Sequence, residues 1–280
     1  MLGAIGPRPI AFASTLDAQG RPNLAPFSFF NAFGSNPPMI LFSPARRVRN
    51  NTTKHTYENI KLHPEVVINI VNYDMVHQVS LASTEYPEGV NEFEKAGFTQ
   101  VASDIVRPFR VKESPVQYEC VVKNVMDLGT EGGAAGLVFC EIVRIHVRED
   151  LLDDKLSIDQ KRIDTVGRMG GNYYVRAHGA ALFEVPKPLR TLGIGVDRLP
   201  QEIRNSRILT GNDLGKLGNV EELPDETSVN DFKLTTLSDL FVEFEDRPKD
   251  LETALHEKAH DYLEKGLVEE AWLTLLSFNN

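Results

Sequence analysis

The chain has 280 residues, of which 41% are hydrophobic and 25% are charged, and its formal net charge is −10 at pH 7. These values are typical of a globular protein that is long enough for one large domain, or for one domain with an appendage. An acidic surface repels a phosphate backbone, so the charge argues against general nucleic-acid binding.

Membrane insertion and secretion are also disfavoured. No apolar run reaches the ~18 residues that a membrane-spanning helix needs. The N-terminal sequence MLGAIGPRPI lacks the basic and apolar segments of a secretion signal. We therefore expect a cytoplasmic protein with no membrane partner, in which Cys120 and Cys140 are packed thiols in apolar runs and form neither a disulfide nor a metal pair.

Strand patterns dominate the chain up to about residue 188. In chain order we expect a hairpin over 8–32, a strand over 39–43, a basic loop over 46–56, a short helix over 56–63, a strand over 65–72, helices over 75–83 and 87–97, and long paired strands over 114–128 and 136–147. Many strands with few helices between them favour a closed or partly open barrel over alternating strand–helix units.

The pattern changes after Pro188. Residues 189–224 show no clear periodicity, and an acidic, linker-like stretch follows over 221–231. Two terminal helices are predicted, over 250–265 with Asp250 as N-cap and over 267–277. We therefore divide the chain into a barrel domain, residues 1–188, and a C-terminal extension, residues 189–280, that ends in helices.

One histidine pair has the spacing of a zinc motif. His256 and His260 are four residues apart in the sequence HEKAH, but the downstream positions where a third ligand is expected hold Leu263 and Gly266. We interpret the pair as part of an amphipathic helix surface and expect no metal.

The glycine-rich stretches do not predict a nucleotide site. Residues 193–195 lack the third spaced glycine of a dinucleotide fingerprint, and residues 132–136 lie between strands and not before a helix. Both are expected to be turns.

The basic loop is a candidate phosphate site, because it comes directly before a helix N-terminus. Free backbone N–H groups, the helix dipole and side-chain cations combine there to bind anions. Its cations are Arg46, Arg47, Arg49, Lys54 and His55, and its hydroxyl groups include that of Thr56. On charge alone, a solvated surface loop is the alternative.

Small and hydroxyl-bearing residues on three predicted strands favour a flat ligand. A planar aromatic ring can lie against Ala25 and Pro26 and use hydroxyl donors at its polar edge. Pro26 has no N–H, which costs nothing where a ligand interrupts the strand ladder. The residues of this wall are Ser14, Thr15, Ala25, Pro26, Phe27, Ser28 and Ser43.

Five segments together carry a family resemblance. Residues 7–38, 54–60, 86–97, 113–120 and 167–174 resemble the flavin reductase-like family of FMN-binding split barrels, in its flavoredoxin-type branch. The resemblance covers residues 5–188. It implies a mainly β protein with a six-stranded split β-barrel and peripheral helices, forming a homodimer with FMN near the subunit interface.

The resemblance also implies roles for particular residues. It assigns binding of the FMN phosphate to Ser43, Lys54 and Thr56 with the neighbouring arginines. It assigns contact with the edge of the flavin ring to Ser14, Thr15, Pro26, Phe27 and Ser28. Arg168, Gly170 and Gly171 are expected near the site. His55 stands where the family has a helix-capping Asp, and when protonated it would instead contact the phosphate.

The function that the resemblance implies is an FMN-dependent oxidoreductase that uses NAD(P)H as a transient reductant and passes electrons to a flavin or another small acceptor. The chemistry belongs to the flavin, so no catalytic side chain is expected. Two alternatives stay open: a carrier with tightly bound FMN that serves an electron-transfer protein, and a non-catalytic barrel whose extension binds a partner.

Overall fold

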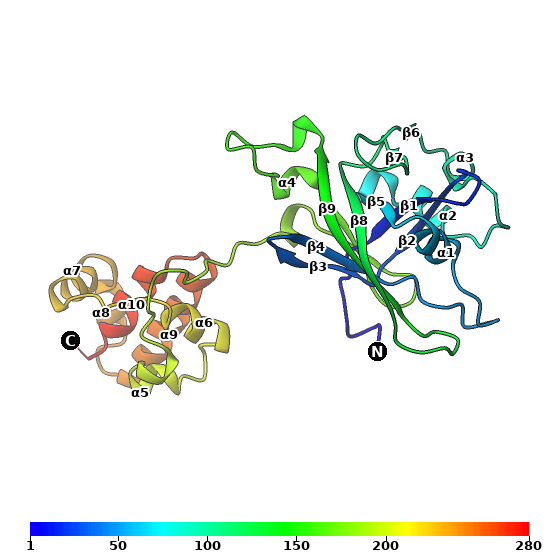
Figure 1. Cartoon of the computed structure of the whole chain (residues 1–280). Helices are drawn as coiled ribbons and strands as arrows, with labels where there is room; N and C mark the ends of the chain where they lie inside the picture. Colours follow the sequence, from blue (N-terminus) through cyan, green and yellow to red (C-terminus); the bar gives the residue numbers. More distant parts are fainter. Residues whose placement is uncertain (280) are drawn as a thin grey trace. The chain divides into compact units, whose positions relative to one another are not determined.

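The chain forms two compact units, Met1–Phe183 and Glu184–Asn280, in a computed structural model that describes residues 1–279 (Figure 1). The division lies close to the boundary expected after residue 188. We call the two parts unit 1 and unit 2.

Unit 1 is built on one antiparallel sheet of seven strands in the order β2-β1-β5-β8-β9-β4-β3. The strands are β1 (Ala11–Leu16), β2 (Pro22–Phe27), β3 (Phe30–Ser35), β4 (Pro38–Phe42), β5 (Glu65–Ile70), β8 (Val116–Asp127) and β9 (Gly136–Val147). Two short hairpins are separate from it, β6 (Gln100–Val101) with β7 (Arg110–Val111), and β10 (Val166–Arg168) with β11 (Tyr174–Arg176).

The mainly β character is as predicted, but the strand count of six is not confirmed. The edge strands β2 and β3 do not pair with each other within residues 1–279, so the sheet is not closed by hydrogen bonds. Sequence analysis missed β3 as a strand. Asn36 and Pro37 form the turn between β3 and β4, and this turn signal lies close to the Pro38 at which β4 begins.

Strand β1 lies between β2 and β5 and separates two parts of the core. Phe12 packs into one cluster with Leu24 and Phe98, while Ala11 and Ala13 face a second cluster on the other side of the strand. Alternation of side chains along a strand explains this division. Strand β1 is buried on both faces and pairs with β2 along its whole length. Residues of β2 line the two cavities described below.

Short helices lie beside β1 and β2. They are α1 (His55–Leu62), α2 (Val76–Leu81) and α3 (Glu92–Ala96), and a further short helix, α4 (Gln160–Ile163), follows β9. The helix α1 begins one residue before its predicted start, so Lys54 is its N-cap. The helix predicted over 87–97 forms only from Glu92, behind the cap Asn91, and ends as expected at Gly97 with a φ of 73°.

Unit 2 is helical. Its helices are α5 (Gln201–Arg204), α6 (Gly211–Leu217), α7 (Glu226–Thr236), α8 (Ser238–Glu243), α9 (Pro248–Glu264) and α10 (Val268–Leu276). They surround the buried Trp272, whose indole N–H donates to the carbonyl of Leu217 at 3.2 Å.

Two expectations for this part of the chain were wrong. The acidic stretch is not a linker, because Asp225 caps α7 and accepts a hydrogen bond from the N–H of Ser228. Asp250 is not the N-cap of α9 either: the helix begins at Pro248, which needs no N–H in the first turn.

Along residues 1–279, no helix combines the length and apolar character needed to cross a bilayer. Cys120 and Cys140 are both buried and unpaired, as expected. Burial raises the pKa of each thiol, so both stay protonated and unreactive at neutral pH.

Candidate functional site

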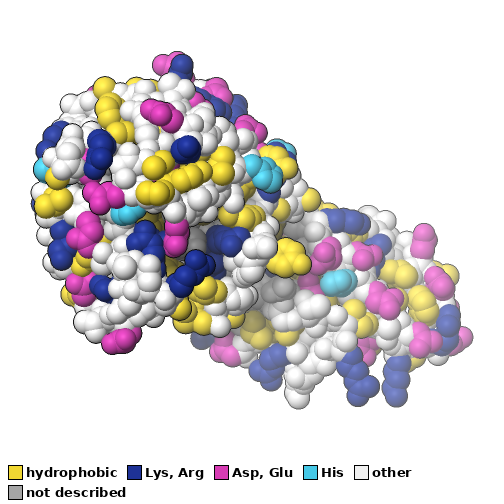
Figure 2. Space-filling model, turned by 90° about the vertical axis from the view of Figure 1, so that its right-hand side faces the viewer, with side chains coloured by type: hydrophobic (Ala, Val, Ile, Leu, Met, Phe, Trp, Pro, Cys, Tyr) yellow, Lys and Arg dark blue, Asp and Glu magenta, His cyan; other side chains and the backbone are white. Residues whose placement is uncertain are grey.

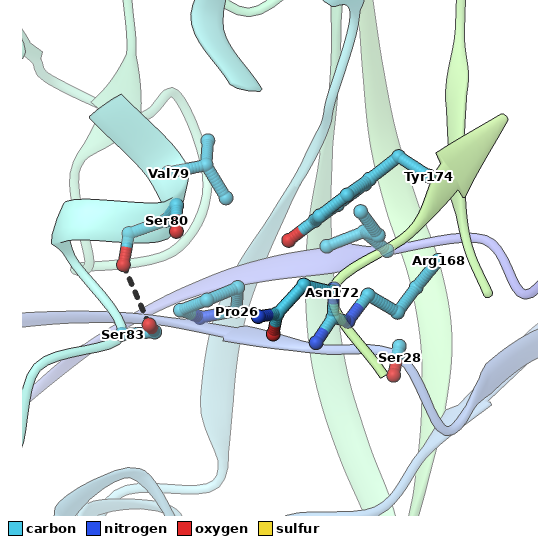
Figure 3. A pocket seen from close by; sticks show the side chains of 9 residues that line it. Pro26, Ser28, Val79, Ser80, Ser83, Arg168, Asn172 and Tyr174 are labelled. Atoms are coloured by element: carbon cyan, nitrogen blue, oxygen red, sulfur yellow. Dashed lines mark hydrogen bonds between the residues drawn. The ribbon is translucent and has the colours of Figure 1, made fainter. Parts of the chain in front are cut away.

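A polar cavity of unit 1 lies over strand β2. It has a volume of about 420 Å³ and is lined by Ile10, Pro26, Ser28, Val79, Ser80, Ser83, Arg168, Asn172 and Tyr174. Figure 3 shows Val79 and Ser80 approaching from α2, while Asn172 and Tyr174 come from the β10–β11 hairpin on the opposite side. We call it the ring cavity.

A second, narrower cavity of about 40 Å³ continues along the same strand. Its lining residues are Asn23, Ala25, Arg47, Lys54, His55, Thr56, Ala82, Ser83, Thr84, Glu85, Tyr86 and Glu92. We call it the cation cavity. Ser83 lines both cavities, and β2 contributes residues to each, so the two cavities adjoin, and together we call them the recess. Figure 2 shows basic side chains gathered around a hollow on this face.

The two ends of the recess have different chemistry. Residues predicted for a flat ring, Pro26 and Ser28, line the ring cavity. Residues predicted for a phosphate line the cation cavity: Arg47, Lys54, His55 and Thr56. The structure therefore brings part of the predicted ring wall and part of the predicted phosphate loop to adjoining cavities, although they are separate in sequence.

Glu85 occupies the centre of the basic cluster. One of its carboxylate oxygens lies 3.3 Å from Nε of Arg47 and 3.4 Å from Nζ of Lys54. The hydrogen bond from Lys54 is the main reason why the pKa of Glu85 is below its usual value. A carboxylate thus sits where the two cations would hold a phosphate oxygen.

His55 lies beside these cations at the first position of α1. Burial lowers its pKa, and the charges of Arg47 and Lys54 lower it further, against an opposing effect of Glu88. The imidazole is therefore mostly neutral at pH 7, because the lowered pKa lies below the ordinary 6.5.

Asn23 links the strands to helix α1, and sequence analysis missed it. Its amide donates to Oγ1 of Thr15 at 3.2 Å and to Oγ1 of Thr56 at 2.9 Å, and Asn59 also donates to Thr15 at 3.0 Å. Thr15 is 1% exposed, so its hydroxyl group serves this internal network. The register that places Asn23 opposite Thr15 in the β1–β2 hairpin was the signal available.

Four residues of the predicted wall do not line the recess: Thr15, which serves the network described above, and Phe27, Ser14 and Ser43. Phe27 packs on Phe42 in the core, with ring centroids 5.5 Å apart, because it alternates with Pro26 and Ser28 along the strand. Ser14 and Ser43 are buried, and neither lines the ring cavity or the cation cavity. Each has a hydroxyl oxygen without a hydrogen-bond partner in the described chain.

Arg46 does not line the recess either. It donates to the side chain and the carbonyl of Asn51, at 2.7 Å and 2.6 Å, and so stabilises the loop before α1. Gly170 and Gly171 also lie outside the lining. They form the turn of the β10–β11 hairpin, where Gly171 has a φ of 57° and a Cβ on Gly170 would lie 3.0 Å from Gly3.

Other lining residues were not predicted. Asn172 and Tyr174 belong to the motif GRMGGNYY, so the resemblance alone could have pointed to them. Ser80 and Ser83 gave no signal in the sequence, because they lie on α2 and just after it, in a segment that was predicted only to be helical.

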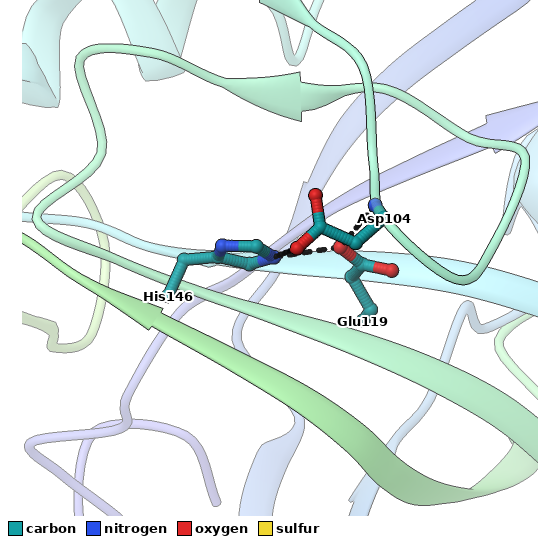
Figure 4. Close-up of side chains that lie close together, drawn as sticks. All are labelled: Asp104, Glu119 and His146. Carbon is teal, nitrogen blue, oxygen red and sulfur yellow. Dashed lines mark hydrogen bonds and ion pairs between the residues drawn. The ribbon is translucent and has the colours of Figure 1, made fainter.

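A second polar cluster joins Glu119 on β8 and His146 on β9 to Asp104 in the loop between β6 and β7 (Figure 4). Glu119 is fully buried, its carboxylate lies 2.6 Å from Nε2 of His146, and it accepts backbone N–H groups from residues 104, 105 and 106. Burial would raise the pKa of Glu119, but these hydrogen bonds lower it to about 2. Although Asp104, Glu119 and His146 could bind a cation, the carboxylate is already used to anchor a loop.

The two histidines of HEKAH have separate partners. His256 Nδ1 lies 2.7 Å from the hydroxyl of Ser206, and His260 Nδ1 lies 2.9 Å from Oδ2 of Asp213. They do not converge on a shared ligand position. His260 is instead grouped with Asp213 and Glu264, a set that could hold a cation, in which Asp213 forms the capping box of α6.

Comparison with known proteins identifies unit 1. The model of the flavin reductase like domain matches residues 4–167. The chain belongs to this family. The match lies within unit 1, so the flavin reductase-like assignment concerns that unit and not the helical unit 2.

Relatives of the flavin reductase-like domain support this assignment. A protein of Aquifex aeolicus strain VF5 is 36% identical over 185 residues, which are 66% of this chain and 92% of the relative. The crystal structure of nitrilotriacetate monooxygenase component B from Bacillus cereus is 30% identical, with a TM-score of 0.61 over 66% of this chain and 90% of that one. A split-barrel protein from Shewanella frigidimarina NCIMB 400 is 28% identical, with a TM-score of 0.58 over 66% and 89%. The predicted family is confirmed, and with it the split-barrel fold.

Proposed function

We propose that unit 1 binds FMN along strand β2 and acts as an NAD(P)H-dependent oxidoreductase. The observation that carries this proposal is the recess of a flavin reductase-like domain, with a ring-sized cavity at one end and paired cations at the other. A volume of about 420 Å³ is within the range of small-molecule sites.

The residues of the recess fit the parts of FMN. Arg47 and Lys54 already hold a carboxylate, that of Glu85, so the same cations can hold a phosphate. The N-terminus of α1 adds free backbone N–H groups beside them. Pro26 offers a flat surface for a ring, and Ser28 offers a hydroxyl group at its edge.

When bound, the flavin supplies the acceptance and release of hydride or electrons. The side chains of the recess bind and orient it. Val79 and Ile10 exclude water from one part of the cavity, while Ser80, Ser83 and Asn172 provide polar contacts. We assign no acid, base or nucleophile to the protein.

Rapid mixing with nicotinamides tests the oxidoreductase proposal. The FMN-loaded protein is mixed anaerobically with NADH or NADPH, and flavin absorbance is followed in a stopped-flow instrument. Bleaching within seconds supports a reductase. A flavin that stays oxidised with both donors would instead favour an electron carrier.

We also propose that the protein is a homodimer through the edge of the sheet at β3. Phe29 and Phe33 are 40% and 67% exposed there. They border a mostly apolar cavity of about 370 Å³, to which Leu41 and Leu137 also contribute. Exposed aromatic side chains on a free sheet edge favour contact with a second chain.

A further inference from the structure

Arg168 is a cation without a counter-ion in the ring cavity. Within residues 1–279, its guanidinium group has no carboxylate or carbonyl partner and lies only against the ring of Tyr174, at 4.7 Å. Two other arginines of this region differ in this respect. Arg47 is paired with Glu85, and Arg176 forms a bidentate pair with Asp164.

The backbone of Arg168 is held in place. Its N–H and carbonyl exchange hydrogen bonds with those of Arg8, at 2.8 Å and 3.0 Å. Arg8 is itself buried, and its side chain donates to the carbonyls of Leu2, Ile5 and Met169. An arginine whose backbone is held in the cavity wall, and whose guanidinium group has no counter-ion, is available to an anion that comes from outside the chain.

The surroundings of Arg168 define the rest of that ligand. Figure 3 shows Arg168 and Asn172 reaching over Pro26 and Ser28. With the flavin ring lying on Pro26, the apolar surfaces of Val79 and Tyr174 suit a second planar ring, and the guanidinium fork suits a planar carboxylate at its edge. An oxidised flavin ring carries no net charge, and the phosphate of FMN has its own cations in the other cavity.

We propose that Arg168 selects a second ligand, a planar aromatic compound that carries a carboxylate, and binds it beside the flavin. This inference rests on the proposed function, because it names the class of ligand that the FMN-loaded domain binds next to its flavin. Arg168 is the residue that distinguishes such an acid from its uncharged analogue.

Benzoate and benzamide are suitable probes, because they share shape and differ in charge. Each is titrated into the FMN-loaded protein, and binding is followed by the change in flavin absorbance and by calorimetry. We expect benzoate to bind at least ten-fold more tightly than benzamide. Arg168→Gln should weaken benzoate binding roughly ten- to hundred-fold, as expected for a charged hydrogen-bonded pair, and leave benzamide unchanged.

Two further variants complete the experiment. Arg148→Gln removes the same charge at an exposed site, where Arg148 pairs only with Asp150, and should leave the preference for benzoate intact. Arg168→Lys keeps the charge but not the fork, and should give an intermediate affinity. If Arg168→Gln does not fold, the affinity of Arg168→Lys for benzoate tests the inference in its place.

Equal binding of the two probes to the native protein would overturn the inference. So would a loss of FMN affinity in Arg168→Gln with an unchanged preference for benzoate, since Arg168 would then serve the cofactor. If the native protein takes up no FMN, the proposed function fails. Calorimetry of the flavin-free protein with both probes still decides the role of Arg168.

Discussion

Glu85 holds two cations that are proposed to bind the phosphate of FMN. It lies 3.3 Å from Arg47 and 3.4 Å from Lys54, so an incoming phosphate must displace its carboxylate. Glu85→Gln removes this competition, and we expect FMN to bind roughly two- to five-fold more tightly, as for other exposed ion pairs. Fluorescence titration with FMN measures the change.

The control is Glu88→Gln, which removes the same charge a few residues away, where Glu88 pairs with Arg21 at 3.6 Å. Glu88→Gln should change the affinity for FMN much less than Glu85→Gln does. An affinity that stays the same or falls in Glu85→Gln would show that Glu85 does not compete with the phosphate.

Glu119 is expected to stabilise unit 1 in a pH-dependent way. Its pKa falls from an ordinary 4.5 to about 2 in the folded protein. Because the folded pKa is the lower one, the stabilisation is complete above about pH 4.5 and is lost as the pH falls toward 2. The shift corresponds to a free energy on the order of 3 kcal/mol.

Urea unfolding of Glu119→Gln tests this expectation. The variant should be clearly less stable than the native protein at pH 7, and the difference should shrink at pH 3. Glu131→Gln, at an exposed loop position, should behave like the native protein at both pH values. If the difference in unfolding free energy between the native protein and Glu119→Gln did not depend on pH, the role given to the ionised carboxylate would be contradicted.

Individual site residues could be predicted only in part. Pro26, Ser28, Lys54 and Thr56 were named from sequence and do line the recess. Phe27 was also named, but its side chain packs into the core. Which face of a strand a residue occupies can be decided only when the register of the strand is known. Asn23 was missed because its role depends on a contact with Thr56, which is far away in sequence.

At the level of elements, the N-terminus of α1 joins the phosphate loop to the sheet. Its N-cap, Lys54, makes no capping side-chain bond in the described chain, and His55 occupies the first helical position. A phosphate there would bind protonated His55 more tightly than neutral His55. Since burial and nearby cations lower the pKa of His55, FMN affinity should rise as the pH falls below 6.5.

Measuring FMN affinity from pH 5 to pH 8 tests this dependence. The His55→Asn variant reports how the titration of the FMN phosphate itself changes binding, so the difference between the two curves isolates the histidine. Two parallel curves would show that His55 takes no part in binding the phosphate.

The elements predicted well are those with a strong local signal. The two long strands β8 and β9 and the helix α9 follow apolar patterns that span many residues. The hairpin β3–β4 was missed, because β3 is mostly exposed and its pattern is not apolar–polar alternation. Helix α7 was missed because its sequence is acidic and has no apolar stripe: Val229 is the one buried residue among Glu226–Thr236.

For the whole molecule, the exposed edge at β3 predicts a dimer that depends on Phe33. Phe33→Asp places a charge in the proposed contact and should shift the protein toward monomers in sedimentation velocity. Leu62→Asp, at a similarly exposed apolar position at the end of α1, should leave the dimer intact. A native protein that is monomeric at micromolar concentration would refute this proposal.

The central claim is that one recess binds both the ring and the phosphate of FMN. Titrating the flavin-free protein with FMN and with riboflavin, which lacks the phosphate, tests it most directly. We predict that FMN binds at least ten-fold more tightly than riboflavin, and that replacing Lys54 with Gln removes most of the difference. Failure to bind either flavin, or equal affinity for both, would contradict the account.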